Sequence, residues 1–166
     1  MIGEIVKTYW IVLVLLILII FEICIIKKII EYSNKSISKK EKDINRYSRY
    51  YYMCSSWLDA KSKGREVADY LNERNICTIG VYGMADIGYK LCKELSKSSN
   101  IKIQFVMDRN ISIDTMFAPL VKNDDVIPNV DAIIVTPIHV FNSIEADLIK
   151  KTNNKIISLE DIIYNL

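Results

Sequence analysis

Residues 77–88 read Cys77-Thr78-Ile79-Gly80-Val81-Tyr82-Gly83-Met84-Ala85-Asp86-Ile87-Gly88, an apolar run that breaks on glycine and resumes with helical spacing. This is the pattern of a strand, a glycine turn and a helix that open a nucleotide-binding α/β unit. The dinucleotide pattern G-x-G-x-x-G uses its glycines for a tight turn, for approach of the pyrophosphate and for close helix packing. Gly83 and Gly88 occupy the outer positions and Ala85 the middle one, so a methyl group stands where a phosphate would approach.

An acidic residue follows at the interval that such a site requires. The next apolar run, residues 101–107, ends at Asp108, which is 20 residues after Gly88. A carboxylate at this interval hydrogen-bonds ribose hydroxyls, and the helix N-terminus offers N–H groups to an anion. The pattern therefore predicts a nucleotide site. It also fits a Rossmann-like fold in which the glycines serve close packing alone and Asp108 is a solvated strand end.

The rest of the C-terminal region alternates apolar strands with amphipathic helices, which is typical of a parallel sheet covered on both faces. Strands are expected at 76–82, 101–107, 120–121, 131–135 and 155–157, and helices at 86–96, 142–151 and 158–164. The predicted fold class is α/β, a doubly wound, mainly parallel five-stranded Rossmann-like sheet. One transmembrane helix and a helical pair, at 44–61 and 65–73, are expected to precede it.

The N-terminal segment is strongly apolar. Residues 9–26 form an 18-residue run broken only by Glu22, long enough to span a bilayer and without the cleavage site of a signal peptide. We predict a single transmembrane anchor at 1–30, a polar, basic juxtamembrane linker at 31–43 and a Rossmann-like domain with N-terminal helices at 44–166. Glu22 is expected either to snorkel beside Lys27 and Lys28 or to pair with a group on another transmembrane helix.

The distribution of charge predicts the orientation. Residues 1–43 contain 7 basic and 5 acidic side chains, of 22 and 20 in the whole chain, which leaves 15 of each for residues 44–166. Most lysines of the first segment follow the apolar run, so the positive-inside rule predicts a single-pass protein of the cell membrane with its domain in the cytoplasm. A neutral domain without a basic stripe argues against nucleic acid as a partner.

Further candidate site residues follow from the fold. Ligands of doubly wound sheets bind beyond the carboxyl ends of the strands, where strand order reverses. Residues 83–88, Asp108, Arg109, Thr136 and Pro137 are therefore expected to line a cofactor site. His139, the only histidine, is a candidate acid or base there, although a lone histidine is more often a loop or helix-start residue than a catalytic base.

Other chemistry has little support in the sequence. No lysine follows the glycine turn as a phosphate loop needs, and no metal-ligand spacing occurs. The four cysteines, Cys24, Cys54, Cys77 and Cys92, form no CxxC pair and are expected to be small buried thiols.

Several segments together resemble known domains. The motifs are the Tyr50-Tyr51 and Trp57-Leu58 pairs and the segments 68–71, 79–84, 106–109, 131–136 and 156–159. In order and spacing they resemble the Rossmann-like domains, of the NAD(P)- or nucleotide-sugar-binding type, attached to bacterial surface-polysaccharide and glycosyltransferase proteins. This resemblance covers about three quarters of the chain and implies NAD(P) or a nucleotide-sugar as ligand, and a membrane-associated glycan enzyme as partner.

A second resemblance covers only the cofactor half. The segment Asp131-Ala132-Ile133-Ile134-Val135-Thr136-Pro137, with His139 nearby, is similar to the fourth-strand signature of glucose-fructose-oxidoreductase-type dehydrogenases. It implies that the threonine-proline turn would lie beside a nicotinamide.

Three functions remain open at this stage. The first is a membrane-anchored cytoplasmic accessory protein that binds a nucleotide or nucleotide-sugar in surface-polysaccharide or glycosyltransfer biosynthesis. The second is a small NAD-dependent oxidoreductase or epimerase subunit with His139 as acid or base. The third is a ligand-free interaction module that recruits a membrane partner.

Overall fold

The structure is a computed structural model that describes residues 2–109, 116–122 and 125–166; within its first helix, the side chains of residues 2, 4–9, 11–12, 14–15 and 17 are outside the description. The chain divides into two compact units, unit 1 at Met1–Tyr47 and unit 2 at Ser48–Leu166. The helix α1 runs from Ile2 to Ser62 and includes residues 31–43, which the sequence suggested as a linker.

Unit 2 is built on a parallel sheet of four strands, β1 (Thr78–Tyr82), β2 (Lys102–Met107), β3 (Ala132–Val135) and β4 (Lys155–Ser158), in the order β2-β1-β3-β4. The α/β class and the parallel sheet are confirmed. The prediction of five strands is wrong. Leu120 forms only an isolated parallel bridge with Val106 at the edge of β2, because the chain there makes two backbone hydrogen bonds and then turns away.

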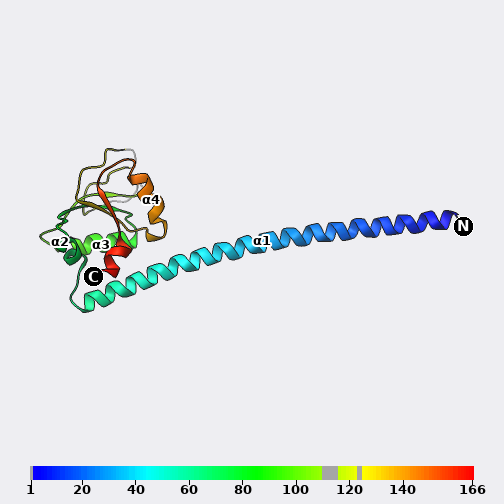
Figure 1. The fold of residues 1–166 in the computed structure, drawn as a ribbon, viewed down its shortest axis with the longest axis horizontal. Helices are drawn as coiled ribbons and strands as arrows, with labels where there is room; N and C mark the ends of the chain where they lie inside the picture. Colours follow the sequence, from blue (N-terminus) through cyan, green and yellow to red (C-terminus); the bar gives the residue numbers. More distant parts are fainter. Residues whose placement is uncertain (1, 110–115, 123–124) are drawn as a thin grey trace. The chain divides into compact units, whose positions relative to one another are not determined.

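Helices cover both faces of this sheet (Figure 1). They are α2 (Val67–Glu73), α3 (Asp86–Leu95), the 3-10 helix η1 (Ile138–Val140), α4 (Phe141–Leu148) and α5 (Leu159–Tyr164). One apolar core joins a sheet face to α2, α3, α5 and the unit 2 segment of α1, and a second core joins the other face to α4. The predicted helices at 65–73, 86–96 and 158–164 end within one residue of the observed ends.

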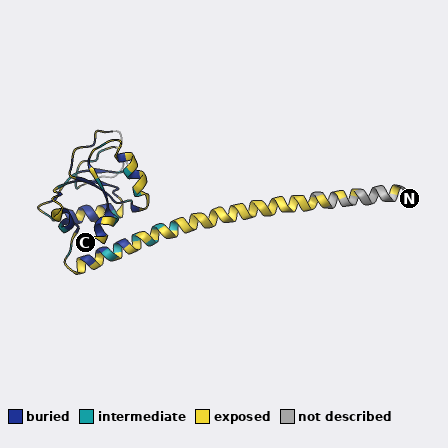
Figure 2. Cartoon of the chain, in the orientation of Figure 1, coloured by how far each residue is buried: buried dark blue, intermediate teal, exposed yellow. Residues whose placement is uncertain are grey.

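The C-terminal end of α1 belongs to the core of unit 2. Met53 and Trp57 are buried among α2, α3 and the sheet, whereas the described side chains of residues 18–42 are all exposed (Figure 2). The last turns of α1 are therefore an integral layer of the α/β unit.

Among the side chains that the structure describes, no helix has a stretch long and apolar enough to cross a membrane. Six members of the predicted span lie outside that description, namely Tyr9, Ile11, Val12, Val14, Leu15 and Ile17.

Candidate functional site at the carboxyl edge of the sheet

The turn after β1 requires a glycine at its first position. Gly83 has a φ of +94°, in the left-handed region that L side chains rarely adopt. A Cβ built there would lie 2.6 Å from Cδ of Pro137 and 2.7 Å from Oγ1 of Thr136. Any larger residue would be strained and would also collide with the end of β3.

Gly88 allows α3 to pack directly on this turn. A Cβ on Gly88 would lie 1.9 Å from the carbonyl oxygen of Gly83, a distance that no side chain tolerates. Close packing of helix on strand, which both interpretations of the glycine pattern require, is thus present. It does not by itself distinguish a ligand site from a packing motif.

Ala85 fits the middle position without strain. It is the N-cap of α3 with φ of −66°, a conformation open to any residue, and it is exposed. Ile87 is half-buried, while Asp86, in the first turn, is exposed and carries a negative charge. That charge complements the helix dipole but opposes a phosphate at the same helix end.

Asp108 faces the glycine turn. Its Oδ2 accepts a hydrogen bond of 2.6 Å from the backbone N–H of Met84, and the side chain is half-buried. Arg109 is exposed, and the segment that follows it, 110–115, lies outside the described residues. The carboxylate predicted to bind a ribose therefore stands at the turn, where it also holds that turn in place.

The end of β3 completes the edge. Thr136 is buried, and its hydroxyl donates to the carbonyl oxygen of Gly83 at 2.7 Å. Pro137 lies against Gly83. The ends of β1, β2 and β3 thus meet at the point where strand order reverses, between β1 and β3.

His139 lies apart from this convergence. It is exposed in η1, and its Nδ1 is 3.1 Å from the hydroxyl of Tyr50, which also donates to the carbonyl oxygen of Thr136 at 3.3 Å. His139 lines a cavity of about 530 Å³, together with Arg49 and Ser158 among others, and neither Gly83 nor Asp108 belongs to that lining. The sequence analysis missed Tyr50, because a contact across 89 residues leaves no local signal.

Arg49 and Glu160 form an ion pair on this side of the unit. Two nitrogens on one edge of the Arg49 guanidinium donate to the Glu160 carboxylate, Nε to Oε1 at 3.2 Å and Nη2 to Oε2. The hydrogen bond to Glu160 raises the pKa of Arg49 above its usual value, so the guanidinium stays charged. The pair links the unit 2 segment of α1 to α5.

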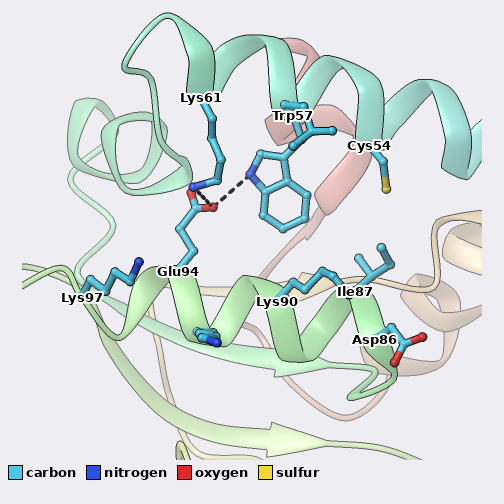
Figure 3. A pocket seen from close by; sticks show the side chains of 10 residues that line it. Cys54, Trp57, Lys61, Asp86, Ile87, Lys90, Glu94 and Lys97 are labelled. Carbon is cyan, nitrogen blue, oxygen red and sulfur yellow. Dashed lines mark hydrogen bonds and ion pairs between the residues drawn. The ribbon is translucent and has the colours of Figure 1, made fainter.

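A groove of about 540 Å³ lies between α1 and α3 within unit 2 (Figure 3). Trp57, Leu58 and Ile87 contribute apolar surface to it, and lysines line it as well, at positions 61, 90, 93 and 97. Asp86 and Ile87 belong to this groove too, so it begins at the helix end that the glycine turn presents.

A buried carboxylate closes one end of the groove. Glu94 is 6% exposed and accepts hydrogen bonds from Trp57 Nε1 at 3.0 Å and from the backbone N–H of Val67 at 2.9 Å. Lys61 Nζ lies 2.6 Å from the same carboxylate. Figure 3 shows Trp57 and Lys61, both from α1, meeting Glu94 of α3. Glu94 is therefore a structural junction, and the sequence analysis did not identify it.

The cysteine prediction is correct only for Cys92, which is buried. Cys54 is half-buried, and Cys24 and Cys77 are exposed. Cys77 lies just before the first residue of β1 and is exposed, so apolar neighbours in the sequence did not imply that this thiol is buried. Among the described residues, no group of three or more His, Cys, Asp or Glu side chains is arranged to hold a metal ion.

Comparisons with protein-family models, curated proteins and solved structures found no match to this chain. The two resemblances drawn from the sequence therefore stay predictions.

Proposed function

We propose that unit 2 binds a nucleotide or nucleotide-sugar at the carboxyl edge of its sheet. The observation that carries this proposal is the meeting of Gly83, Asp108 and Thr136 where strand order reverses. In open α/β sheets this is the crevice in which ligands bind. The N-terminus of α3, a helix of 10 residues, opens at the same place and favours an anionic group.

Two features shape the mode of binding. The exposed methyl of Ala85 narrows the approach of a pyrophosphate, and the carboxylate of Asp86 repels it. Asp108 is suited to ribose hydroxyls, because its carboxylate stands at the glycine turn and follows Gly88 at the interval at which an acidic group reaches a ribose. A ligand held mainly through its ribose fits this edge better than one held mainly through phosphate.

Residues 9–26 suggest that the domain is tethered to the cell membrane and faces the cytoplasm. This element of the proposal rests on the apolar run and on the lysines after it. The proposed accessory role in surface-polysaccharide or glycosyltransfer biosynthesis rests only on the sequence resemblance.

Calorimetric titration of the full-length protein in detergent micelles with NAD, NADP and a UDP-sugar tests the binding proposal. We expect a saturable signal with at least one of them, weakened tenfold or more in Asp108→Asn and unchanged in Asp147→Asn, an exposed carboxylate on α4. Thermal unfolding of both variants separates lost binding from lost folding. The absence of a saturable calorimetric signal with all three ligands at millimolar concentration would contradict the proposal.

The groove between α1 and α3 provides a second control. Its lysines could attract phosphate without any role for the glycine turn. If Lys90→Ala abolished binding while Asp108→Asn did not, the ligand would lie in the groove and the proposed site would be wrong.

One contact favours the enzymatic alternative, a small NAD-dependent oxidoreductase or epimerase subunit. The hydroxyl of Tyr50 and Nδ1 of His139 are within hydrogen-bond distance beside a cavity, and such a pair can relay a proton. Hydride exchange with candidate sugars should disappear in His139→Ala and fall in Tyr50→Phe. An unchanged rate in His139→Ala would exclude this role.

A further inference from the structure

Unit 1 carries aliphatic side chains at a constant interval of seven residues along α1. They are Leu16, Ile23, Ile30, Ile37 and Ile44. Their exposed fractions lie between 48% and 62%, although each is a side chain that proteins usually bury. Seven residues make almost two helical turns, so these side chains form one continuous stripe.

The stripe persists where the sequence around it is polar. Between residues 33 and 43, Ile37 is the only apolar side chain. The same stretch contains Ser33, Asn34, Ser36 and Ser38, which are weak helix formers, yet it is helical throughout. A polar helix without packing partners has little to stabilise it. Ile37 keeps the seven-residue interval within this polar stretch, which indicates that another helix packs along the stripe.

A second set of positions follows each aliphatic residue by three. It consists of Ile19, Ile26, Ser33, Lys40 and Tyr47. Alternating spacings of three and four are the heptad pattern of coiled coils, and two-fold dimers are the commonest symmetric assemblies of soluble proteins. We infer that two copies of this chain associate through these two sets of positions, the heptad stripe, as a parallel, in-register, two-stranded coiled coil.

The charges beside the heptad stripe suit this parallel register. Glu22 immediately precedes Ile23, and Lys27 follows Ile26. In a parallel coiled coil, the residue just before a first position, such as Glu22, lies close to the residue five places later on the other helix, here Lys27. Glu22 of each copy then faces Lys27 of the other, which gives two symmetric ion pairs of opposite charge. Lys40, the charged member of the stripe, likewise comes beside Glu41 of the second copy.

The length of the heptad stripe is sufficient for a coiled coil. From Leu16 to Tyr47 it covers more than four heptads, with an aliphatic residue at every first position and an apolar or aromatic residue at three of the five second positions. The same interval recurs at Tyr51 and Leu58, both exposed in unit 2. This inference does not depend on nucleotide binding, and either proposal can fail without the other.

Disulfide crosslinking of the full-length protein in detergent micelles tests the register. Cys24, Cys54 and Cys77 are changed to serine, and the buried Cys92 is retained. Single cysteines are then introduced at Ile37 or Ile44 in the heptad stripe, or at Lys35 or Lys42 on the opposite side of the helix. We expect disulfide-linked dimers to form at least tenfold faster from the stripe positions. Equal rates at all four positions would overturn the inference.

Light scattering tests the association itself with charge-matched variants. Ile37→Lys with Ile44→Lys should convert the dimer to a monomer, while Ser38→Lys with Asn45→Lys, one residue further along, should leave it a dimer. Unfolding of unit 2 should be the same in both. A monomeric wild-type protein, a dimer that survives the stripe substitutions, or equal dissociation of both variants would overturn the inference.

A charge exchange tests the orientation. Glu22→Lys and Lys27→Glu should each weaken the dimer, and the two together should restore it. If the double variant were weaker than either single one, the helices would not be parallel and in register.

Discussion

The carboxylate of Glu94 joins three helices of unit 2 through buried contacts. It is 6% exposed and receives the indole N–H of Trp57, the backbone N–H of Val67 and the ammonium of Lys61. These three partners come from α1, the start of α2 and α1 again, so one side chain on α3 fastens two other helices. Among the described residues, Glu94 is the acceptor of both the indole N–H of Trp57 and the backbone N–H of Val67, and Glu94→Ala removes it.

The expected cost follows from the groups left behind. Each buried donor without an acceptor costs about 1–3 kcal/mol, and Trp57 and Val67 are both buried. Lys61 is 38% exposed on its side chain and can turn to water, so its ion pair adds little. Glu94→Ala should therefore lower the free energy of unfolding by about 2–6 kcal/mol. Glu94→Gln keeps one carbonyl oxygen and should cost about half as much.

Denaturant unfolding of the full-length protein, followed by the fluorescence of Trp57, measures this cost. Trp10→Phe removes the other tryptophan, and fluorescence is preferable to circular dichroism because the long α1 dominates the helical signal. Asp147→Ala is the matched control, since it removes an exposed carboxylate 3.7 Å from Lys150 and should change stability by less than about 0.5 kcal/mol. A Glu94→Ala variant as stable as this control would refute the reasoning.

Three further predictions concern titration and backbone geometry. Hydrogen bonds from Thr78 and Cys77 hold the pKa of Asp131 below its ordinary value. The ionised carboxylate of Asp131 therefore contributes its full stabilisation at a pH above the pKa of an unfolded aspartate, and this stabilisation is lost as the pH falls through the lowered pKa of the folded protein. The melting temperature of Asp131→Asn should consequently depend less on pH below about 4 than that of the wild type. Burial raises the pKa of Cys92 to about 12, so iodoacetamide at pH 8 should label Cys77 and spare Cys92, and equal labelling in native protein would contradict the burial. Gly64 and Gly83 both have a positive φ, of 76° and 94°, so alanine is strained at either position. A Cβ at position 64 meets open space, whereas one at position 83 also collides with the end of β3, so Gly83→Ala should lower the melting temperature more than Gly64→Ala. Equal losses would mean that backbone strain alone matters.

The elements that follow from local pattern were predictable from the sequence. The alternation of apolar runs and amphipathic helices indicated the parallel sheet, and the interval from Gly88 to Asp108 anticipated that this carboxylate would stand at the glycine turn. Both depend on the geometry of a single βαβ unit, in which a short stretch of chain sets the distances.

The features that depend on distant segments were not predictable in this way. The sequence at Leu120 and Val121 predicts a strand, but only Leu120 forms a bridge to β2. Strand formation depends on the neighbouring strands and side chains, which the local sequence does not contain. The contacts of Glu94 with Trp57 and of Tyr50 with His139 span 37 and 89 residues. A glutamate on an amphipathic helix reads as solvent-facing until the helices that cover it are known.

The packing of residues 48–62 into the α/β core determines where this protein can be shortened. A fragment that began at Arg65, just ahead of α2, would retain every strand but would strip Met53 and Trp57 from the apolar layer over the sheet. Such a fragment would expose the apolar surface that Met53 and Trp57 cover, and it would leave the Glu94 carboxylate without the indole donor of Trp57. Expression of a well-behaved globular fragment should therefore begin no later than Ser48, well upstream of the first strand.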